Sequence, residues 1–155
     1  MLTVSDGVVA GTREDTSGDV LQELLEGDGY EVERRVVPDD ATAIEAALTE
    51  LVAGGGIVLT TGGTGVAPRD VTPEATRRAL DREAPGLAEA IRADSIAKTP
   101  HALLSRGVAG TIGKTLVVNL PGSPGGCRDG FRILQPALGH ALELLAGEET
   151  AHRQT

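Results

Sequence analysis

Two aspartates, Asp39 and Asp70, stand where a protein could hold a divalent cation among phosphates. Each follows a segment that predicts a β-strand, over residues 30–37 and 57–60. Ligands of parallel α/β sheets bind beyond the carboxyl ends of the strands, so both carboxylates can project over one edge although they lie 31 positions apart in the sequence. Two carboxylates at one site repel each other unless a cation lies between them, and oxygen ligands combined with phosphates suit Mg²⁺. We therefore predict that these aspartates are catalytic residues that bind magnesium.

Helix capping is the alternative explanation for such acidic residues. Asp39 and Asp40 follow a proline at the start of an expected helix, where aspartate is a favoured N-cap. The sequence leaves both interpretations of Asp39 open. Asp70 is harder to explain by capping, because Thr72, with Pro73 at the first helical position, is expected to fill that role.

The segment Thr-Gly-Gly-Thr-Gly at residues 61–65 ends a strand that is expected to be buried. A turn that needs positive φ would account for an isolated pair of glycines. Here the bare N–H groups of residues 62–65, together with the Thr64 hydroxyl, can approach phosphate oxygens closely. Arg69, in the same loop, would supply a cationic phosphate partner. We predict that Gly62, Gly63, Thr64, Gly65 and Arg69 bind substrate or nucleotide.

Two further loops follow expected strands. Ser5 and Asp6 begin a polar segment after residues 2–4, and ligand contact and simple capping of the next helix by Asp15 or Ser17 both remain open. The other loop, rich in glycine and proline, adds four predicted ligand-binding residues, which are Asn119, Pro121, Gly122 and Ser123.

Several apparent motifs do not support other chemistries. The glycines in residues 110–115 are three apart instead of the five of a P-loop, and a hairpin explains the segment better. Residues 122–125 lack the spacing of a nucleophile elbow. The three histidines lack metal-ligand spacing, and Cys127 is interpreted as a packed residue.

The order of elements predicts an α/β fold. Strands are expected at residues 2–4, 30–37, 57–60, 108–111 and 115–119, the last two forming a hairpin. Helical spacing of apolar residues predicts helices near residues 20–25, 44–52, 72–82, 87–97 and 138–145, and Pro136 is expected to interrupt the chain before the last. This alternation implies a three-layer α/β/α sandwich around a mostly parallel sheet, with one domain over residues 1–147 and a polar tail over residues 148–155.

Composition excludes several classes of function. The 14 Lys and Arg and 23 Asp and Glu give a net charge of −9, which argues against a nucleic-acid binder. No apolar run approaches the roughly 18 residues of a membrane span. A lone cysteine and the lack of a signal-peptide pattern lead us to expect a cytoplasmic protein.

Seven segments resemble signature segments of the MogA/MoaB family of molybdenum-cofactor biosynthesis proteins. They lie at residues 4–6, 15–18, 37–40, 60–65, 68–76, 104–106 and 119–124, so the resemblance runs over nearly the whole chain.

The resemblance implies a molybdopterin-binding fold, a homotrimer and Mg-ATP-dependent adenylylation of molybdopterin to adenylyl-molybdopterin, with release of pyrophosphate and handover to a molybdotransferase. The functional aspartates of the family match Asp39 and Asp70, its nucleotide- and pterin-binding loop matches residues 62–65, and Ser105 and Asn119 match polar positions near the pterin. The alternative function is that of a non-catalytic molybdopterin carrier of the MoaB type.

Overall fold

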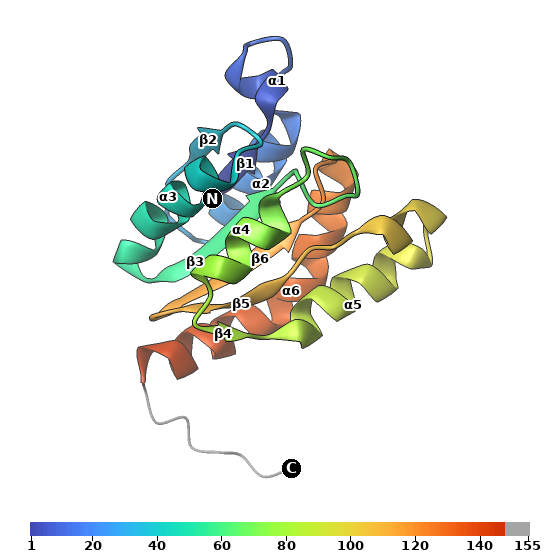
Figure 1. Ribbon diagram of the computed structural model, residues 1–155. Helices are drawn as coiled ribbons and strands as arrows, with labels where there is room; N and C mark the ends of the chain where they lie inside the picture. The colour runs from blue at the N-terminus through green and yellow to red at the C-terminus, as the bar shows by residue number, and fades with distance from the viewer. Residues whose placement is uncertain (148–155) are drawn as a thin grey trace.

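A six-stranded sheet lies between two layers of helices in the computed structural model, which describes residues 1–147 (Figure 1). The polar tail predicted for residues 148–155 lies outside the described residues. The strands are β1 (Leu2–Val4), β2 (Arg35–Val37), β3 (Gly56–Thr61), β4 (Arg82–Glu83), β5 (Ala109–Ile112) and β6 (Thr115–Leu120). The helices are α1 (Asp6–Val9), α2 (Thr16–Gly27), α3 (Ala41–Leu51), α4 (Thr72–Ala79), α5 (Pro85–Ile96) and α6 (Pro124–Ala146), with 3₁₀ turns η1 (Val52–Gly54) and η2 (Pro100–Leu104).

The strand order β2-β1-β3-β6-β5-β4 places the reversal of winding between β1 and β3. From β1 the chain passes through α2 to β2 on one side, then through α3 to β3 on the other. The strands β2, β1, β3 and β6 are parallel, while β5 is antiparallel to both β6 and β4. Ligands of such sheets bind at the carboxyl edge beside the reversal point.

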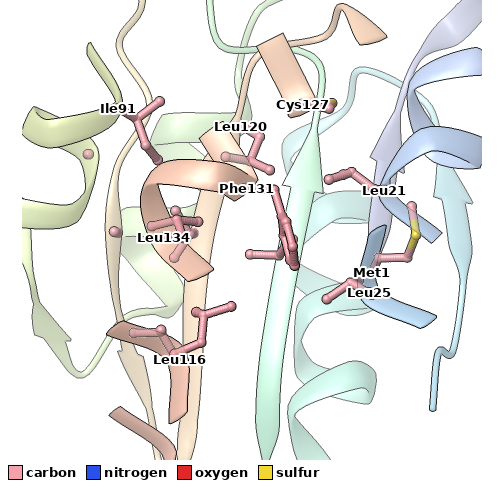
Figure 2. Close-up of a cluster of buried hydrophobic side chains, with 14 of the residues drawn as sticks. Met1, Leu21, Leu25, Ile91, Leu116, Leu120, Cys127, Phe131 and Leu134 are labelled. Atoms are coloured by element: carbon pink, nitrogen blue, oxygen red, sulfur yellow. The ribbon is translucent and has the colours of Figure 1, made fainter. Parts of the chain in front are cut away.

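Alternation of side chains along the central strands builds a hydrophobic core on each face of the sheet. On β6, Leu116 and Val118 belong to the cluster beneath α2, α5 and α6, whereas Val117 belongs to the cluster beneath α3 and α4. Figure 2 shows the first cluster, in which Phe131 and Leu134 of α6 pack over the sheet beside side chains of α2. Burial on both faces explains why these strands are nearly continuous apolar runs.

The predicted three-layer sandwich with a mostly parallel sheet is confirmed, but several boundaries differ. The strand expected over residues 30–37 is reduced to β2, and the helix expected over residues 72–82 ends at Ala79. The loop expected before α2 contains the short helix α1, and the two-residue strand β4 has no counterpart among the predicted elements. Both unpredicted elements are too short to show a periodic pattern of apolar residues.

Capping also differs at one predicted position. Asp15 and Asp40 cap α2 and α3, accepting N–H groups of Gly18 and Ala43, each at 2.9 Å. The prediction that Thr72 caps α4 is wrong, because Thr72 is already the first helical residue. Its hydroxyl instead donates to the carbonyl of Gly62 at 2.9 Å. Thr72 thus fastens α4 to residues 61–65, which we call the glycine-rich loop.

The prediction that Pro136 interrupts the C-terminal helix is also wrong. Helix α6 runs for 23 residues through Pro136, which is exposed. Phe131, Leu134 and Leu138 are buried on both sides of the proline, and this packing outweighs the roughly 3 kcal/mol that an interior proline costs. None of the helices in residues 1–147 combines the length and apolar content needed to cross a membrane.

Replacing Pro136 by alanine should stabilise the protein by about 1–3 kcal/mol, because alanine restores the missing helical N–H donor and removes the steric clash. Urea denaturation of both proteins measures the change. The neighbouring exposed Ala137→Gly variant should lose roughly 1 kcal/mol if α6 is continuous here. A Pro136→Ala variant no more stable than the parent would contradict a continuous helix.

Candidate functional site

The loops after β1, β3 and β6 meet at the carboxyl edge of the sheet because their backbones nearly touch. Gly62 has φ +97°, and a Cβ atom there would lie 2.2 Å from the carbonyl oxygen of Val4. A Cβ on Gly122 would in turn lie 3.2 Å from the Cα of Gly62. Any side chain at residue 62 would push β1 and the glycine-rich loop apart, so glycine is required there.

A cavity of about 420 Å³, which we call the acidic cavity, opens where these loops meet. Its lining includes Asp39, Asp70, Gly62, Gly63, Gly122, Ser123 and Ser5 from the predicted set, together with Arg13, Glu14, Asp15, Thr16 and Ser17. The prediction that Asp39 and Asp70 converge on one edge is therefore consistent with the structure.

Asp39 is fixed by a reciprocal pair of hydrogen bonds with Asp6. The N–H of Asp6 donates to Oδ2 of Asp39 at 2.8 Å, and the N–H of Asp39 donates to Oδ1 of Asp6 at 3.0 Å. Arg69 donates from Nε to Oδ2 of Asp6 at 2.5 Å, and this contact, followed by the Asp39 N–H, lowers the pKa of Asp6. Asp40, not Asp39, caps α3, so the carboxylate of Asp39 is left facing the cavity.

Asp70 is held within its own loop. Its Oδ2 accepts the N–H of Ala67 at 2.8 Å, and its own N–H donates to the carbonyl of Ala67 at 2.9 Å. Within residues 1–147, the Oδ1 atoms of Asp39 and Asp70 accept no protein hydrogen bond. Each carboxylate thus keeps one oxygen for a ligand.

The carboxylate oxygens of the acidic cavity fit a magnesium ion that is bound partly by the protein and partly by a phosphate ligand. In the described part of the chain, no cluster of three or more His, Cys, Asp or Glu side chains is arranged to hold a metal ion. A cage made wholly of protein is therefore not built here. Mg²⁺ is commonly bound by one or two carboxylates together with waters and phosphate oxygens, which the free oxygens of Asp39 and Asp70 would satisfy.

Two helix N-termini open onto the acidic cavity and offset its negative charge. Thr16 and Ser17 in the first turn of α2 line it, as do Ser123 and Pro124 at the start of α6. Free N–H groups and the helix dipole make such termini favourable for anions. The cavity therefore combines carboxylates that attract a cation with helix ends that attract phosphate oxygens.

A second cavity of about 430 Å³ lies against α5, and we call it the α5 cavity. Five predicted binding residues line it, namely Thr64, Gly65, Ser105, Pro121 and Ser123. The predicted glycine-rich loop is thus divided, since Gly62 and Gly63 face the acidic cavity while Thr64 and Gly65 face the α5 cavity. Ser123 lines both cavities, so the two adjoin at the start of α6.

Further residues of the α5 cavity were not predicted from the sequence. Ile91, Ser95 and Lys98 follow the spacing i, i+4, i+7 and line it together with Arg92 and Asp129. The Lys98 ammonium lies 2.7 Å from the carboxylate of Asp129. That spacing was visible in the sequence, but it indicates equally an ordinary helix with a solvated face.

Three predicted binding residues line neither cavity. The side chain of Asn119 is buried, where it donates to the hydroxyls of Thr60 and Thr76 at 2.9 and 3.0 Å. Its Oδ1 also accepts a backbone N–H, so Asn119 ties β6 to β3 and α4. Asp6 and Arg69 pair with each other at the margin of the acidic cavity.

Cys127 is a packed residue, as the sequence indicates. Its side chain is fully buried, and burial raises the pKa of the thiol to about 11. The sulfur lies 3.3 Å from the Thr61 hydroxyl, beneath the edge of the sheet. A protonated, buried thiol is inert as a nucleophile.

A doubly wound sheet with adjoining cavities at its carboxyl edge defines the class of α/β proteins that bind ligands beside the reversal of strand order. Residues 1–140 match the family model described as "probable molybdopterin binding domain". The chain belongs to that family.

Three proteins illustrate the likeness. Molybdenum cofactor synthesis protein cinnamon of Drosophila melanogaster is 40% identical over 160 residues, which cover 100% of this chain and 26% of that protein. The chain thus spans about a quarter of that relative. A molybdopterin adenylyltransferase of Haemophilus influenzae is 41% identical over 92% of this chain and 75% of that protein. The crystal structure of the molybdopterin biosynthesis enzyme MoaB from Thermus thermophilus is 50% identical, with a TM-score of 0.87 over 95% of this chain and 94% of that one. The resemblance to the MogA/MoaB family is confirmed.

The Asp15 carboxylate should make the stability of the protein depend on pH. Burial raises its pKa, but the Arg34 guanidinium at 2.6 Å and the Gly18 N–H outweigh burial, and the net pKa is lowered. A lowered pKa in the folded state stabilises the protein above the ordinary aspartate value, and this stabilisation is lost as the pH falls through the folded pKa.

Asn at residue 15 keeps the cap but loses the charge, so Asp15→Asn should cost about 1–2 kcal/mol at pH 7. The difference from the parent should shrink below about pH 4, in denaturation measured from pH 7 to pH 3. Asp19→Asn is the control, since Asp19 pairs with the same arginine but its side chain is 62% exposed. A pH-independent loss for Asp15→Asn would contradict the role of the charge.

Proposed function

We propose that this chain catalyses the Mg-ATP-dependent adenylylation of molybdopterin. The observation that carries the proposal is the pair of adjoining cavities separated by the glycine-rich loop, one acidic and one formed partly by apolar side chains. Transfer of an adenylyl group from one substrate to the other requires two neighbouring sites that meet at the reacting phosphates. The name molybdopterin adenylyltransferase on relatives that share this domain supports the same reaction.

The acidic cavity suits the phosphates of ATP. The N–H groups at Gly62 and Gly63 and the N-termini of α2 and α6 supply donors to phosphate oxygens. Asp39 and Asp70 would repel a bare triphosphate, so this cavity accepts a nucleotide only together with a cation. The two carboxylates would hold Mg²⁺, which when bound neutralises charge on the phosphates.

The α5 cavity suits the pterin. Ile91, Ala102 and Leu104 give it apolar walls for a flat ring, while the Ser105 hydroxyl and the Lys98 ammonium add polar groups at its margin. Ser123 lines both cavities and lies where a phosphate of one ligand would reach the other.

In the proposed reaction, an oxygen of the terminal phosphate of molybdopterin attacks the α-phosphorus of ATP. A new P–O bond forms, the bond to the β-phosphate oxygen breaks, and pyrophosphate leaves with the electron pair. The protein contributes positioning and charge neutralisation more than covalent chemistry. Backbone donors of the glycine-rich loop and Ser123 at the N-terminus of α6 hold phosphate oxygens.

The geometry leads us to revise two of the predicted roles. Arg69 is engaged by Asp6, so we withdraw its predicted role in phosphate binding. Asn119 acts from the interior by joining the strands that carry the site. Ser105 lines the α5 cavity, and in this proposal it keeps its predicted role beside the pterin.

The assembly and context of the protein follow the family in this proposal. A cytoplasmic homotrimer would make adenylyl-molybdopterin and hand it to a molybdotransferase. The net charge of −9 requires local donors and the cation to overcome the repulsion of two anionic substrates.

Mixing the protein with molybdopterin and MgATP tests the proposal. Pyrophosphate and adenylyl-molybdopterin should appear in equal amounts, and EDTA should stop the reaction while the circular dichroism spectrum stays unchanged. Binding of molybdopterin that is independent of nucleotide, with no pyrophosphate, would replace the proposal by the non-catalytic carrier. Failure to bind any pterin would contradict both the adenylyltransferase and the carrier function.

Replacing Asp70 by asparagine should lower kcat by at least about 100-fold, because the charge facing the phosphates is removed. The asparagine oxygen can still accept the Ala67 N–H, so the melting temperature should stay close to that of the parent. Asp40→Asn is the matched control, because it removes a nearby charge that only caps α3. Normal turnover by the Asp70→Asn variant would rule out the magnesium role.

A further inference from the structure

Arg106 fastens the loop that carries Asp70 at several points. Its backbone N–H donates to the carbonyl of Thr64 at 2.8 Å. Its Nε donates to the carbonyl of Gly65, and its Nη2 donates to the carbonyl of Asp70, both at 2.6 Å. The third nitrogen, Nη1, pairs with Glu74 in the first turn of α4. One guanidinium thus bridges the two ends of the segment 65–70.

The segment between these two ends has little else to hold it. Residues 66–69 are exposed and bury no side chain in the core. Thr72 fastens the loop only at Gly62 and Gly63. The Arg69–Asp6 pair also reaches across, but its side chains are 65% and 44% exposed, and exposed ion pairs contribute little.

Arg106 also connects this segment to the second cavity. Ser105, which precedes Arg106, lines the α5 cavity, and so does Gly65, whose carbonyl accepts the Nε of Arg106. Arg92 in turn donates to the carbonyl of Ser105 at 3.2 Å, which fixes that backbone from α5. A movement of Arg106 would therefore displace Asp70 and the wall of the α5 cavity together.

We infer that Arg106 is a positioning residue that sets the place of the Asp70 carboxylate relative to the α5 cavity. The catalytic consequence rests on the proposed function, whereas the control of the loop does not. Lysine has the charge but not the planar fork that reaches two carbonyls at once, so Arg106→Lys should release one end of the segment. A merely structural arginine would instead change global stability without a local effect.

Hydrogen exchange tests control of the loop without any assay of activity. In the Arg106→Lys variant, the amides of Ala67 and Asp70, which are hydrogen-bonded across the turn, should exchange about 10-fold faster than in the parent. Amides of the sheet should be unchanged. Equal exchange at these two amides, or a uniform increase over the whole chain, would overturn the inference.

Two further variants protect this test. Arg78→Lys is the control, because Arg78 makes a surface pair with Glu45 and lines neither cavity. If Arg106→Lys does not fold, Glu74→Gln can replace it, because this variant weakens the ion pair that holds the Arg106 guanidinium in place. It should speed exchange at the two amides by a smaller factor. Parent-like exchange in a folded Glu74→Gln protein would then count against the inference.

Kinetics test the catalytic consequence. Arg106→Lys should lower kcat by about 100-fold and raise the Mg²⁺ concentration for half-maximal rate by about 10-fold. At saturating Mg²⁺, KM for MgATP should change little, since the loop amides at Gly62 and Gly63 are fastened separately. Unchanged kcat with unchanged Mg²⁺ dependence in an active parent would overturn positioning of Asp70. An inactive parent would refute the proposed function, and the exchange result would still decide the role of Arg106.

Discussion

The close approach of the Val4 carbonyl to Gly62 is the constraint on which the rest of the site depends. Strands β1 and β3 are adjacent and parallel, so their carboxyl ends emerge side by side at the reversal of winding. A Cβ at residue 62 would lie 2.2 Å from that carbonyl, so the loop can fold over the end of β1 only where the chain has no side chain. With this contact in place, the loops that carry Asp39 and Asp70 both line one cavity. Without it, the two carboxylates would belong to separate surface loops.

The aspartates at the edge of the sheet fall into two groups, those that pair with an arginine and those that do not. Asp15 and Asp6 are each neutralised by an arginine, and the paired arginines hold the pKa of both carboxyls below the usual range, although burial opposes this at Asp15. Asp39 and Asp70 accept only backbone N–H groups among the described residues. Two carboxylates that line one cavity and form no salt bridge among the described residues are unfavourable in the free protein. The structure tolerates this repulsion beside helix N-termini, which favour negative charge. A ligand that brings both a cation and phosphates would satisfy the carboxylates and the helix ends together.

The features that could be predicted from the sequence are those that depend on periodic patterns of apolar residues and on the positions where strands end. The three-layer architecture, the hairpin and the convergence of Asp39, Asp70 and the glycine-rich loop follow from such patterns. The sequence did not predict that Thr72 donates to the Gly62 carbonyl or that Asn119 is saturated by hydrogen bonds in the interior, because these contacts join residues distant in the chain. The prediction at Pro136 is wrong because the packing of α6 on the sheet outweighs the local propensity of proline to end a helix. The polar residues of α5 were missed because a solvated helix face and the wall of a cavity have the same spacing.

The division of the glycine-rich loop between two cavities bears on whether the protein transfers an adenylyl group or only carries a pterin. A protein that only carries a pterin needs the α5 cavity, and nothing about that cavity requires Asp39 or Asp70, which line only the other one. The acidic cavity is nevertheless held in place by several independent contacts: the reciprocal Asp6–Asp39 hydrogen bonds, the turn at Ala67 and the clamp from Arg106. Ordering exposed loops costs conformational entropy, and placing two carboxylates together adds repulsion. A preorganised arrangement with those costs is useful when charge must be neutralised during a reaction, because the groups then need no rearrangement as the phosphates react. This preorganisation is the physical reason why we propose a transferase and not a carrier.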